Sequence, residues 1–151
     1  GENALGYGRE IGLAQQFGAL LEQEGLEVTH FTAGERFEGR QVSFREITSE
    51  FDLMIYLANL ATKSNQTTVR IEWMNPMGIN CPIYTHTVPT IFISVENPYH
   101  LLDVPHIKTF INCYSCNAYT LPLLADKLFG RSEFTGKSPV DPFCGKWDTR
   151  L

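Results

Sequence analysis

Hydrophobic and polar positions along the chain follow two patterns, one typical of helices and one typical of buried strands. Apolar residues spaced three or four positions apart, together with capping residues, predict helices over residues 9–24, 44–50, 67–73 and 118–129. Runs of apolar, β-branched and aromatic residues predict strands over residues 26–32, 52–58, 90–95 and 107–113. One helical turn is expected over residues 99–103. Strands and helices alternate, which is the pattern of an α/β fold.

The predicted architecture is a three-layer helix–sheet–helix sandwich around a mainly parallel sheet. Gly25 and Gly130 directly follow predicted helices, at the position where glycine commonly ends a helix. A doubly wound sheet normally begins with a strand, but only a short polar and glycine-rich segment precedes the first helix. The sequence therefore predicts either a fold that begins with a helix or a sheet that lacks its first strand.

Composition narrows the class of protein. The 151 residues are 43% hydrophobic and 19% charged, which predicts one soluble globular domain over residues 1–151. No apolar run approaches the roughly twenty residues that cross a bilayer. The net charge is −5 and the 12 Lys and Arg residues are scattered, so we expect binding to neither nucleic acid nor membrane. The compartment, cytoplasmic or secreted, stays open.

Ligands of parallel sheets bind outside the carboxyl ends of the strands, so residues that directly follow strands are the candidates for a site. These residues are Asn59, Thr62, Glu96, Asn97, Tyr99, Tyr114, Ser115 and Asn117. We expect them to form a polar rim that contacts a sugar or a partner domain. The alternative interpretation is local, with Asn97 capping a turn enforced by Pro98 and Tyr99 packing against the fold.

A Cys-x-x-Cys pair, Cys113 and Cys116, lies between a predicted strand and a predicted helix, where helix amides can lower a thiol pKa. This pair suggests a stand-alone thiol redox or small-ligand-binding flavodoxin-like domain as the alternative function. Only one helix and a tail follow the pair, whereas redox motifs of this kind precede several elements. A zinc site with Cys81 and Cys144 would have one close ligand pair instead of two. We therefore predict no metal and no cofactor.

Four segments of the second half resemble the C-terminal α/β-sandwich domain of family 3 glycoside hydrolases. They are Asn-Pro-Tyr at 97–99, Tyr-Ser at 114–115, Leu-Phe-Gly at 128–130 and Gly-Lys-Ser-Pro-Val at 136–140. The resemblance is most specific over residues 51–140 and is closest to the β-N-acetylhexosaminidase branch. The family more often has leucine where this chain has Ser138, which puts the packing role of that position in question.

The resemblance implies a non-catalytic C-terminal module of a glycosidase, of the β-N-acetylhexosaminidase or β-glucosidase type, that hydrolyses O-glycosyl bonds in carbohydrate metabolism. It also implies a partner, the N-terminal catalytic barrel, which carries the nucleophilic Asp. The hexosaminidase branch takes its general acid/base from the barrel as well, whereas the β-glucosidase branch takes a Glu from the sandwich domain. No residue of this chain can be matched to that Glu.

Glycoside hydrolysis needs two carboxyl groups placed on either side of one bond. The candidate carboxyl groups Glu72, Glu96 and Asp103 form no such pair in the predicted elements. We therefore predict no catalytic residue in this chain. The expected contact surface for substrate or barrel consists of Asn97, Tyr99, Tyr114, Ser115 and Asn117.

Overall fold

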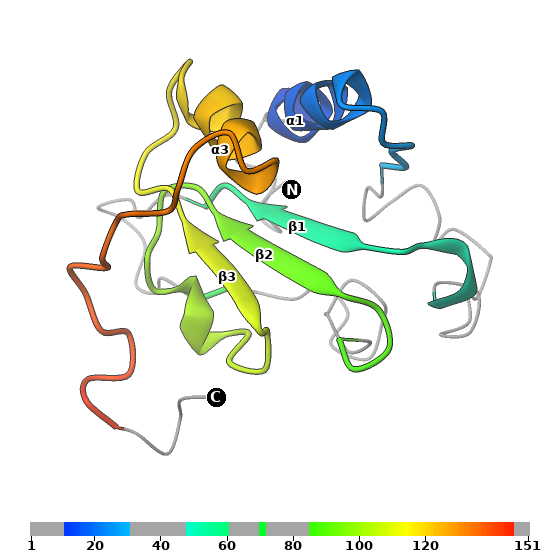
Figure 1. Cartoon of the computed structure of the whole chain (residues 1–151). Coiled ribbons are helices and arrows are strands. Elements are labelled where there is room, and N and C mark those ends of the chain that lie inside the picture. The colour runs from blue at the N-terminus through cyan, green and yellow to red at the C-terminus, as the bar shows by residue number, and fades with distance from the viewer. Residues whose placement is uncertain (1–10, 31–47, 61–69, 72–84, 147–151) are drawn as a thin grey trace.

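The computed structural model describes residues 11–30, 48–60, 70–71 and 85–146 (Figure 1). Its elements, in chain order, are α1 (Ile11–Gln23), β1 (Met54–Ala58), β2 (Thr90–Ser94), η1 (His100–Leu102), β3 (Thr109–Asn112) and α3 (Thr120–Leu128). Residues 48–50 are also helical. None of the described helices is long and apolar enough to cross a membrane.

The sheet confirms the predicted α/β sandwich with a parallel sheet. Its three strands are parallel and lie in the order β1-β2-β3. Helices α1 and α3 cover one face of the sheet, and the 3-10 helix η1 lies on the other face (Figure 1). The carboxyl ends of all three strands therefore meet at one edge of the sheet, beneath the start of α3.

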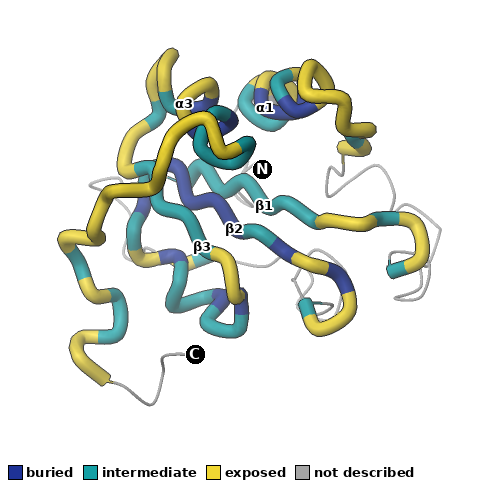
Figure 2. The backbone as a smooth tube through the Cα atoms, in the orientation of Figure 1, coloured by how far each residue is buried: buried dark blue, intermediate teal, exposed yellow. Residues whose placement is uncertain are grey.

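The central strand β2 is buried on both faces, which explains its nearly continuous apolar sequence. Ile93 and Val95 pack among Phe17, Leu21, Leu121 and other residues of the α1 and α3 face. Phe92 points to the opposite face, where it packs with Val104 and Ile107. This strand carries the longest buried stretch of the tube in Figure 2. Complete burial of such side chains stabilises a fold by about 1.5 to 3 kcal/mol each.

Two glycines end the long helices as predicted. Gly25 has φ of 87° and Gly130 has φ of 73°, a left-handed backbone that side chains with a Cβ rarely adopt. After α1, the backbone N–H of Leu26 donates to the carbonyl of Leu21 at 3.2 Å, which completes the terminal turn.

The strand predicted over residues 26–32 is wrong for residues 26–30, which are described and belong to no sheet. A strand needs a neighbour to complete its backbone hydrogen bonds, and these residues have none among the described strands. The helix predicted over residues 67–73 is likewise wrong at Arg70 and Ile71, which are not helical. Ile71 instead donates its backbone N–H to the side chain of Asp103 at 2.9 Å.

Several sequence-based predictions fall outside the described residues. They concern Thr62, Glu72, Cys81, most of the helix predicted over residues 67–73 and the first four residues of the helix predicted over 44–50. The absence of a first strand also stays a prediction, because residues 1–10 lie outside the described part.

Candidate functional site

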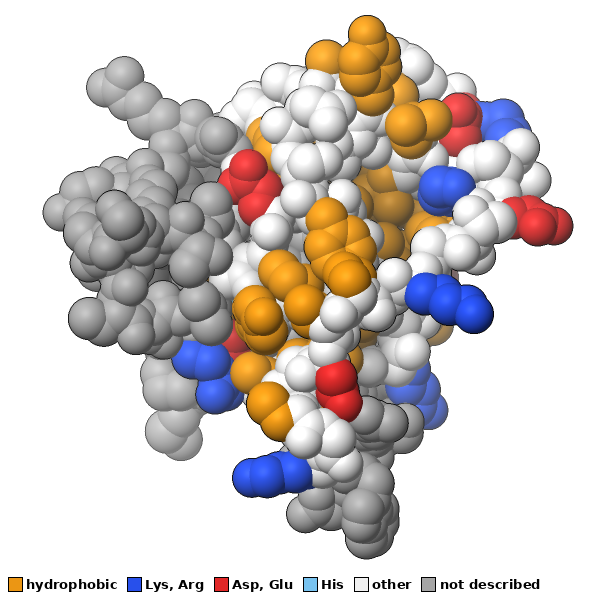
Figure 3. Space-filling view, turned by 90° about the vertical axis from the view of Figure 1, so that its left-hand side faces the viewer, with side chains coloured by type: hydrophobic (Ala, Val, Ile, Leu, Met, Phe, Trp, Pro, Cys, Tyr) orange, Lys and Arg blue, Asp and Glu red, His pale blue; other side chains and the backbone are white. Residues whose placement is uncertain are grey.

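The edge formed by the strand carboxyl ends carries a group of tyrosines and polar side chains. Loops 95–99 and 113–119 begin there, directly after β2 and β3. Figure 3 views the molecule from this side and shows several hydrophobic side chains spread over the surface, with acidic and basic side chains among them. Among the predicted site residues that are described, Tyr99, Tyr114, Ser115 and Asn117 are exposed at this edge.

Asn97 is buried, with 2% of its surface exposed, so it supports this edge from below. Its side-chain oxygen accepts the backbone N–H of Tyr99 at 2.9 Å, the turn-capping contact named as the alternative interpretation. Its own carbonyl accepts a hydrogen bond from Ser94 Oγ. Asn97 therefore fixes the backbone that presents Tyr99.

A second hydrogen bond joins Ser94 to the buried side chain of His100. Ser94 Oγ and His100 Nδ1 are 2.8 Å apart. Because the one hydroxyl proton of Ser94 goes to the carbonyl of Asn97, His100 must donate from Nδ1. Burial lowers the pKa of His100, and the nearby carboxylate of Asp103 opposes that shift only in part. The neutral imidazole is the form that fits this position.

We expect acidification to weaken the fold through His100. Its pKa in the folded protein lies below the value of about 6.5 found in unfolded chains, so the unfolded state binds more protons. The stabilising effect of neutral His100 is complete above that value and declines as pH falls toward the lowered pKa. Urea unfolding at pH 7 and pH 5.5 measures the loss. The substitution His100→Asn keeps a hydrogen-bond donor for Ser94 but removes the titrating imidazole, so it should reduce the loss of stability.

The control for this pH experiment is His86→Asn, since His86 is exposed. That variant should lose as much stability between the two pH values as the unsubstituted chain. If the unsubstituted chain, His100→Asn and His86→Asn all lose the same free energy of unfolding between the two pH values, the pH dependence comes from groups other than His100.

Tyr114 directly follows Cys113 at the end of β3 and has an unusual backbone. Its φ is 62°, and an aromatic residue in this region costs roughly 1 to 2 kcal/mol. The Tyr114 hydroxyl donates to Ser138 Oγ at 2.8 Å, and Ser138 Oγ donates to the carbonyl of Val140 at 2.7 Å. Ser138 thus links the tail to the strand end, a role that leucine, with no polar side-chain group, could not perform.

Ser115 and Asn117 organise the loop that leads into α3. The Asn117 amide nitrogen and Ser115 Oγ are 3.3 Å apart, and Thr120 Oγ1 donates to the Ser115 carbonyl at 3.0 Å. The Asn117 side-chain oxygen accepts the backbone N–H of Tyr119 at 2.9 Å. Both side chains are exposed, so they shape the loop and still present polar atoms to a partner.

Tyr119 also lies at this edge, although it was not among the residues predicted to form the site. It directly precedes α3, and 75% of its surface is exposed, the largest exposed fraction among the large hydrophobic residues of the described chain. The sequence did contain a signal that could have identified Tyr119: it is the second tyrosine of this loop, five residues after Tyr114. Together, Tyr99, Tyr114 and Tyr119 form what we call the tyrosine surface.

The Cys-x-x-Cys pair does not have the properties of a redox site. Cys113 is partly buried and packs against the core beneath α1 and α3. Burial, aided by Cys116, raises its pKa to about 11. Because the reactive form of cysteine is the thiolate, a thiol that stays protonated at neutral pH is a poor nucleophile. Among the described residues, no group of His, Cys, Asp or Glu is arranged to hold a metal ion.

The carboxylate of Asp103 is bound by other residues of the fold. Only 5% of its side chain is exposed, and its two oxygens are occupied by Arg70 Nε and the backbone N–H of Ile71. Arg70 also donates to the carbonyl of Leu102 at 3.0 Å. Asp103 therefore holds the connection between β1 and β2 against the end of η1.

Comparison with known proteins shows to which proteins this chain is related. No family model matches the chain. A β-N-acetylglucosaminidase/β-glucosidase of Cellulomonas fimi is 49% identical over 151 residues, which is 100% of this chain and 27% of that protein. The chain is homologous to a part of the family 3 glycoside hydrolases. The resemblance deduced from residues 97–140 is thereby confirmed.

Solved structures agree with the family 3 relationship. The β-glucoside phosphorylase BglX is 43% identical, with a TM-score of 0.74, and the match covers 99% of this chain and 26% of BglX. BglX bound to 2FGlc gives 42% identity and a TM-score of 0.72, over 96% of this chain and 25% of that one. The chain therefore spans about a quarter of the length of the family 3 proteins it matches.

Proposed function

We propose that this chain is a non-catalytic C-terminal module of a glycosidase that hydrolyses O-glycosyl bonds of the β-N-acetylglucosaminide or β-glucoside type. The observation that carries the proposal is the tyrosine surface, an exposed aromatic area beside the carboxyl ends of the strands. The names and lengths of the relatives support a role within a longer enzyme. The isolated chain should then be inactive.

The partner in this proposal is the N-terminal catalytic barrel of the parent enzyme. Tyrosines combine a large apolar ring with a hydrogen-bonding hydroxyl, which suits the centre of a protein interface. The strained backbone of Tyr114 and the buried support from Asn97 hold two of these rings in set directions. Such a surface binds a partner with little loss of side-chain entropy. Contact of the same edge with the parent's carbohydrate substrate is part of the proposal.

A chimeric enzyme tests this function. In the Cellulomonas fimi relative, the region that matches this chain would be replaced by the chain itself. We expect the chimera to hydrolyse an aryl β-N-acetylglucosaminide with kcat/KM within about tenfold of the relative, a difference of about 1.4 kcal/mol. The relative with that region deleted should be far less active, and the isolated chain should give no turnover.

Two outcomes would contradict the proposal. Turnover by the isolated chain that persists through purification would mean that it carries its own catalytic groups. A chimera as inactive as the deletion variant, although folded, would mean that this chain cannot fill the supporting role of the matching region.

A further inference from the structure

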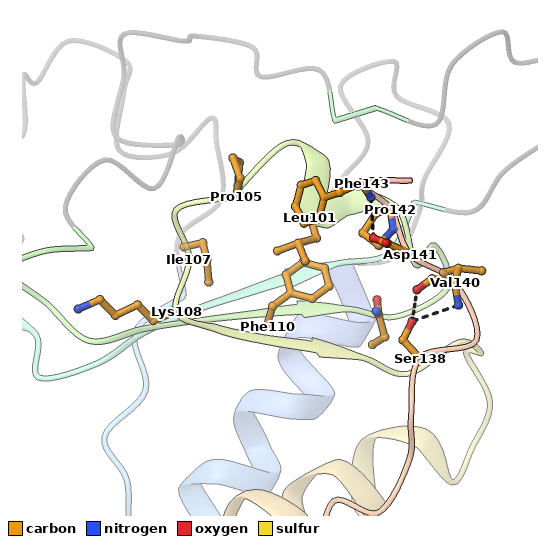
Figure 4. Close-up of a pocket in the computed structure, with 11 residues that line it drawn as sticks. Leu101, Pro105, Ile107, Lys108, Phe110, Ser138, Val140, Asp141, Pro142 and Phe143 are labelled. Atoms are coloured by element: carbon orange, nitrogen blue, oxygen red, sulfur yellow. Dashed lines mark hydrogen bonds between the residues drawn. The ribbon is translucent and has the colours of Figure 1, made fainter. Parts of the chain in front are cut away.

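An open groove of about 540 Å³ lies on the η1 face of the sheet, beside β3. Its floor consists of Leu101, Ile107 and Phe110. Figure 4 shows Phe110 rising from β3 toward Leu101, with tail residues 138–143 along one side and Lys108 at the opposite end. The tail thus supplies a wall of this groove, and no part of the tyrosine surface lines it.

Phe110 ends a row of three stacked aromatic rings that crosses the sheet. The ring centroids of Tyr56 and Phe92 are 5.8 Å apart, and those of Phe92 and Phe110 are 5.5 Å apart, with interplanar angles of 12° and 5°. One face of the Phe110 ring is therefore covered by Phe92. Since β3 is the last described strand on that side, the other face of the ring is directed away from Phe92, toward the groove that it lines.

Polar groups surround this aromatic face. Asn112, Lys108, Ser138 and Asp141 line the groove together with its apolar residues. The side-chain oxygen of Asn112 is buried and has no hydrogen-bond partner in the described chain, which is a costly state for an acceptor. Rotation of the terminal amide is a soft torsion that can bring this oxygen to a donor in the groove.

The wall formed by the tail has a fixed shape. The carboxylate of Asp141 accepts the backbone N–H of Phe143 at 3.0 Å and that of Gly145 at 2.8 Å. Ser138 connects the same wall to Tyr114 at the end of β3. A groove with a fixed wall, an apolar floor and a few polar groups at its margin has the composition of a small-ligand site.

We propose that this groove binds a pyranose ring of a carbohydrate. The apolar C–H face of the sugar would lie on the face of the Phe110 ring that is turned away from Phe92 and continue the row of stacked rings. Its equatorial hydroxyls would then point outward, and one of them would donate to Asn112. An aromatic side chain of a protein partner could cover the same ring but would leave the polar groups around it unpaired. The inference does not depend on docking to a catalytic barrel.

The proposal can be tested on the isolated, isotopically labelled chain by NMR titration with N-acetylglucosamine, methyl β-D-glucoside and N-acetyl-phenylalanine amide. We expect the two sugars to shift the backbone amides of Phe110, Asn112 and Val140. Phe110→Leu keeps the apolar volume but removes the flat ring, so it should weaken sugar binding roughly threefold to tenfold. The matched control is Phe134→Leu, which removes an exposed aromatic ring of the tail outside the groove and should leave sugar binding unchanged.

The absence of shifts at the groove up to the solubility limit of the sugars would overturn the proposal. Shifts confined to Tyr114 and Tyr119, or binding by the phenylalanine amide alone, would also overturn it. If Phe110→Leu fails to fold, Phe143→Ala changes the wall without touching the ring stack and should likewise weaken binding. Inactivity of the chimeric enzyme would leave these expectations unchanged, because they concern the isolated chain.

Discussion

Replacement of Asp103 by alanine should lower the free energy of unfolding by about 2 to 3 kcal/mol. The substitution removes the ion pair with Arg70 and leaves the backbone N–H of Ile71 without its acceptor. Arg70 is half-exposed and can turn to water, so most of the expected loss comes from the partly buried N–H. Urea unfolding of the isolated chain, followed by circular dichroism, measures the change.

The control is Asp126→Ala, which breaks the ion pair of Asp126 with Arg131 at the surface near the end of α3. Such a pair contributes at most about 1 kcal/mol, so this variant should stay close to the unsubstituted chain. Asp103→Asn should fall between the two, because an amide oxygen still accepts from Ile71. Equal stability of the Asp103 and Asp126 alanine variants would mean that the contact with Ile71 contributes nothing measurable.

Replacement of Tyr99 by alanine in the chimeric enzyme should weaken the contact between this chain and the rest of the protein by roughly 1 to 3 kcal/mol. Tyr99 is 37% exposed here, so part of the ring remains for a partner to cover. The same substitution in the isolated chain should cost less, because only the covered part of the ring loses contacts. Thermal unfolding of both proteins, with and without the substitution, gives the comparison.

Phe134→Ala is the control for Tyr99, since Phe134 is exposed but does not follow a strand. It should affect the chimera and the isolated chain alike. If Tyr99→Ala destabilises the isolated chain as much as the chimera, Tyr99 is a packing residue and the tyrosine surface is not a docking face.

The core strands and the last helix could be predicted because their signals are local. β2 is buried on both faces, so its apolar run identified it within one residue at its carboxyl end. The helix that Gly130 terminates, α3, was equally clear, since its apolar positions recur at helical spacing. The segment at residues 26–30 shows the limit of this reasoning: its composition suits a strand, but strand formation requires a neighbouring strand that composition cannot supply.

The candidate site was predictable in position but not in detail. The rule that sites lie at strand carboxyl ends led to Tyr99 and Tyr114. The burial of Asn97 depends on its contact with Ser94, and the role of Ser138 depends on a tyrosine distant in sequence. Such contacts arise only when the chain is folded, so no periodicity or spacing could have indicated them.

The contact between Asp103 and Ile71 divides the long connection between β1 and β2 into two shorter loops. The entropy lost on closing a flexible loop grows with its length, so each part closes at lower cost once the contact exists. Because Asp103 follows η1, the contact requires that the turn after β2 has already formed. We therefore expect the unit of β2, η1 and β3 to form before the connection from β1 is held against it.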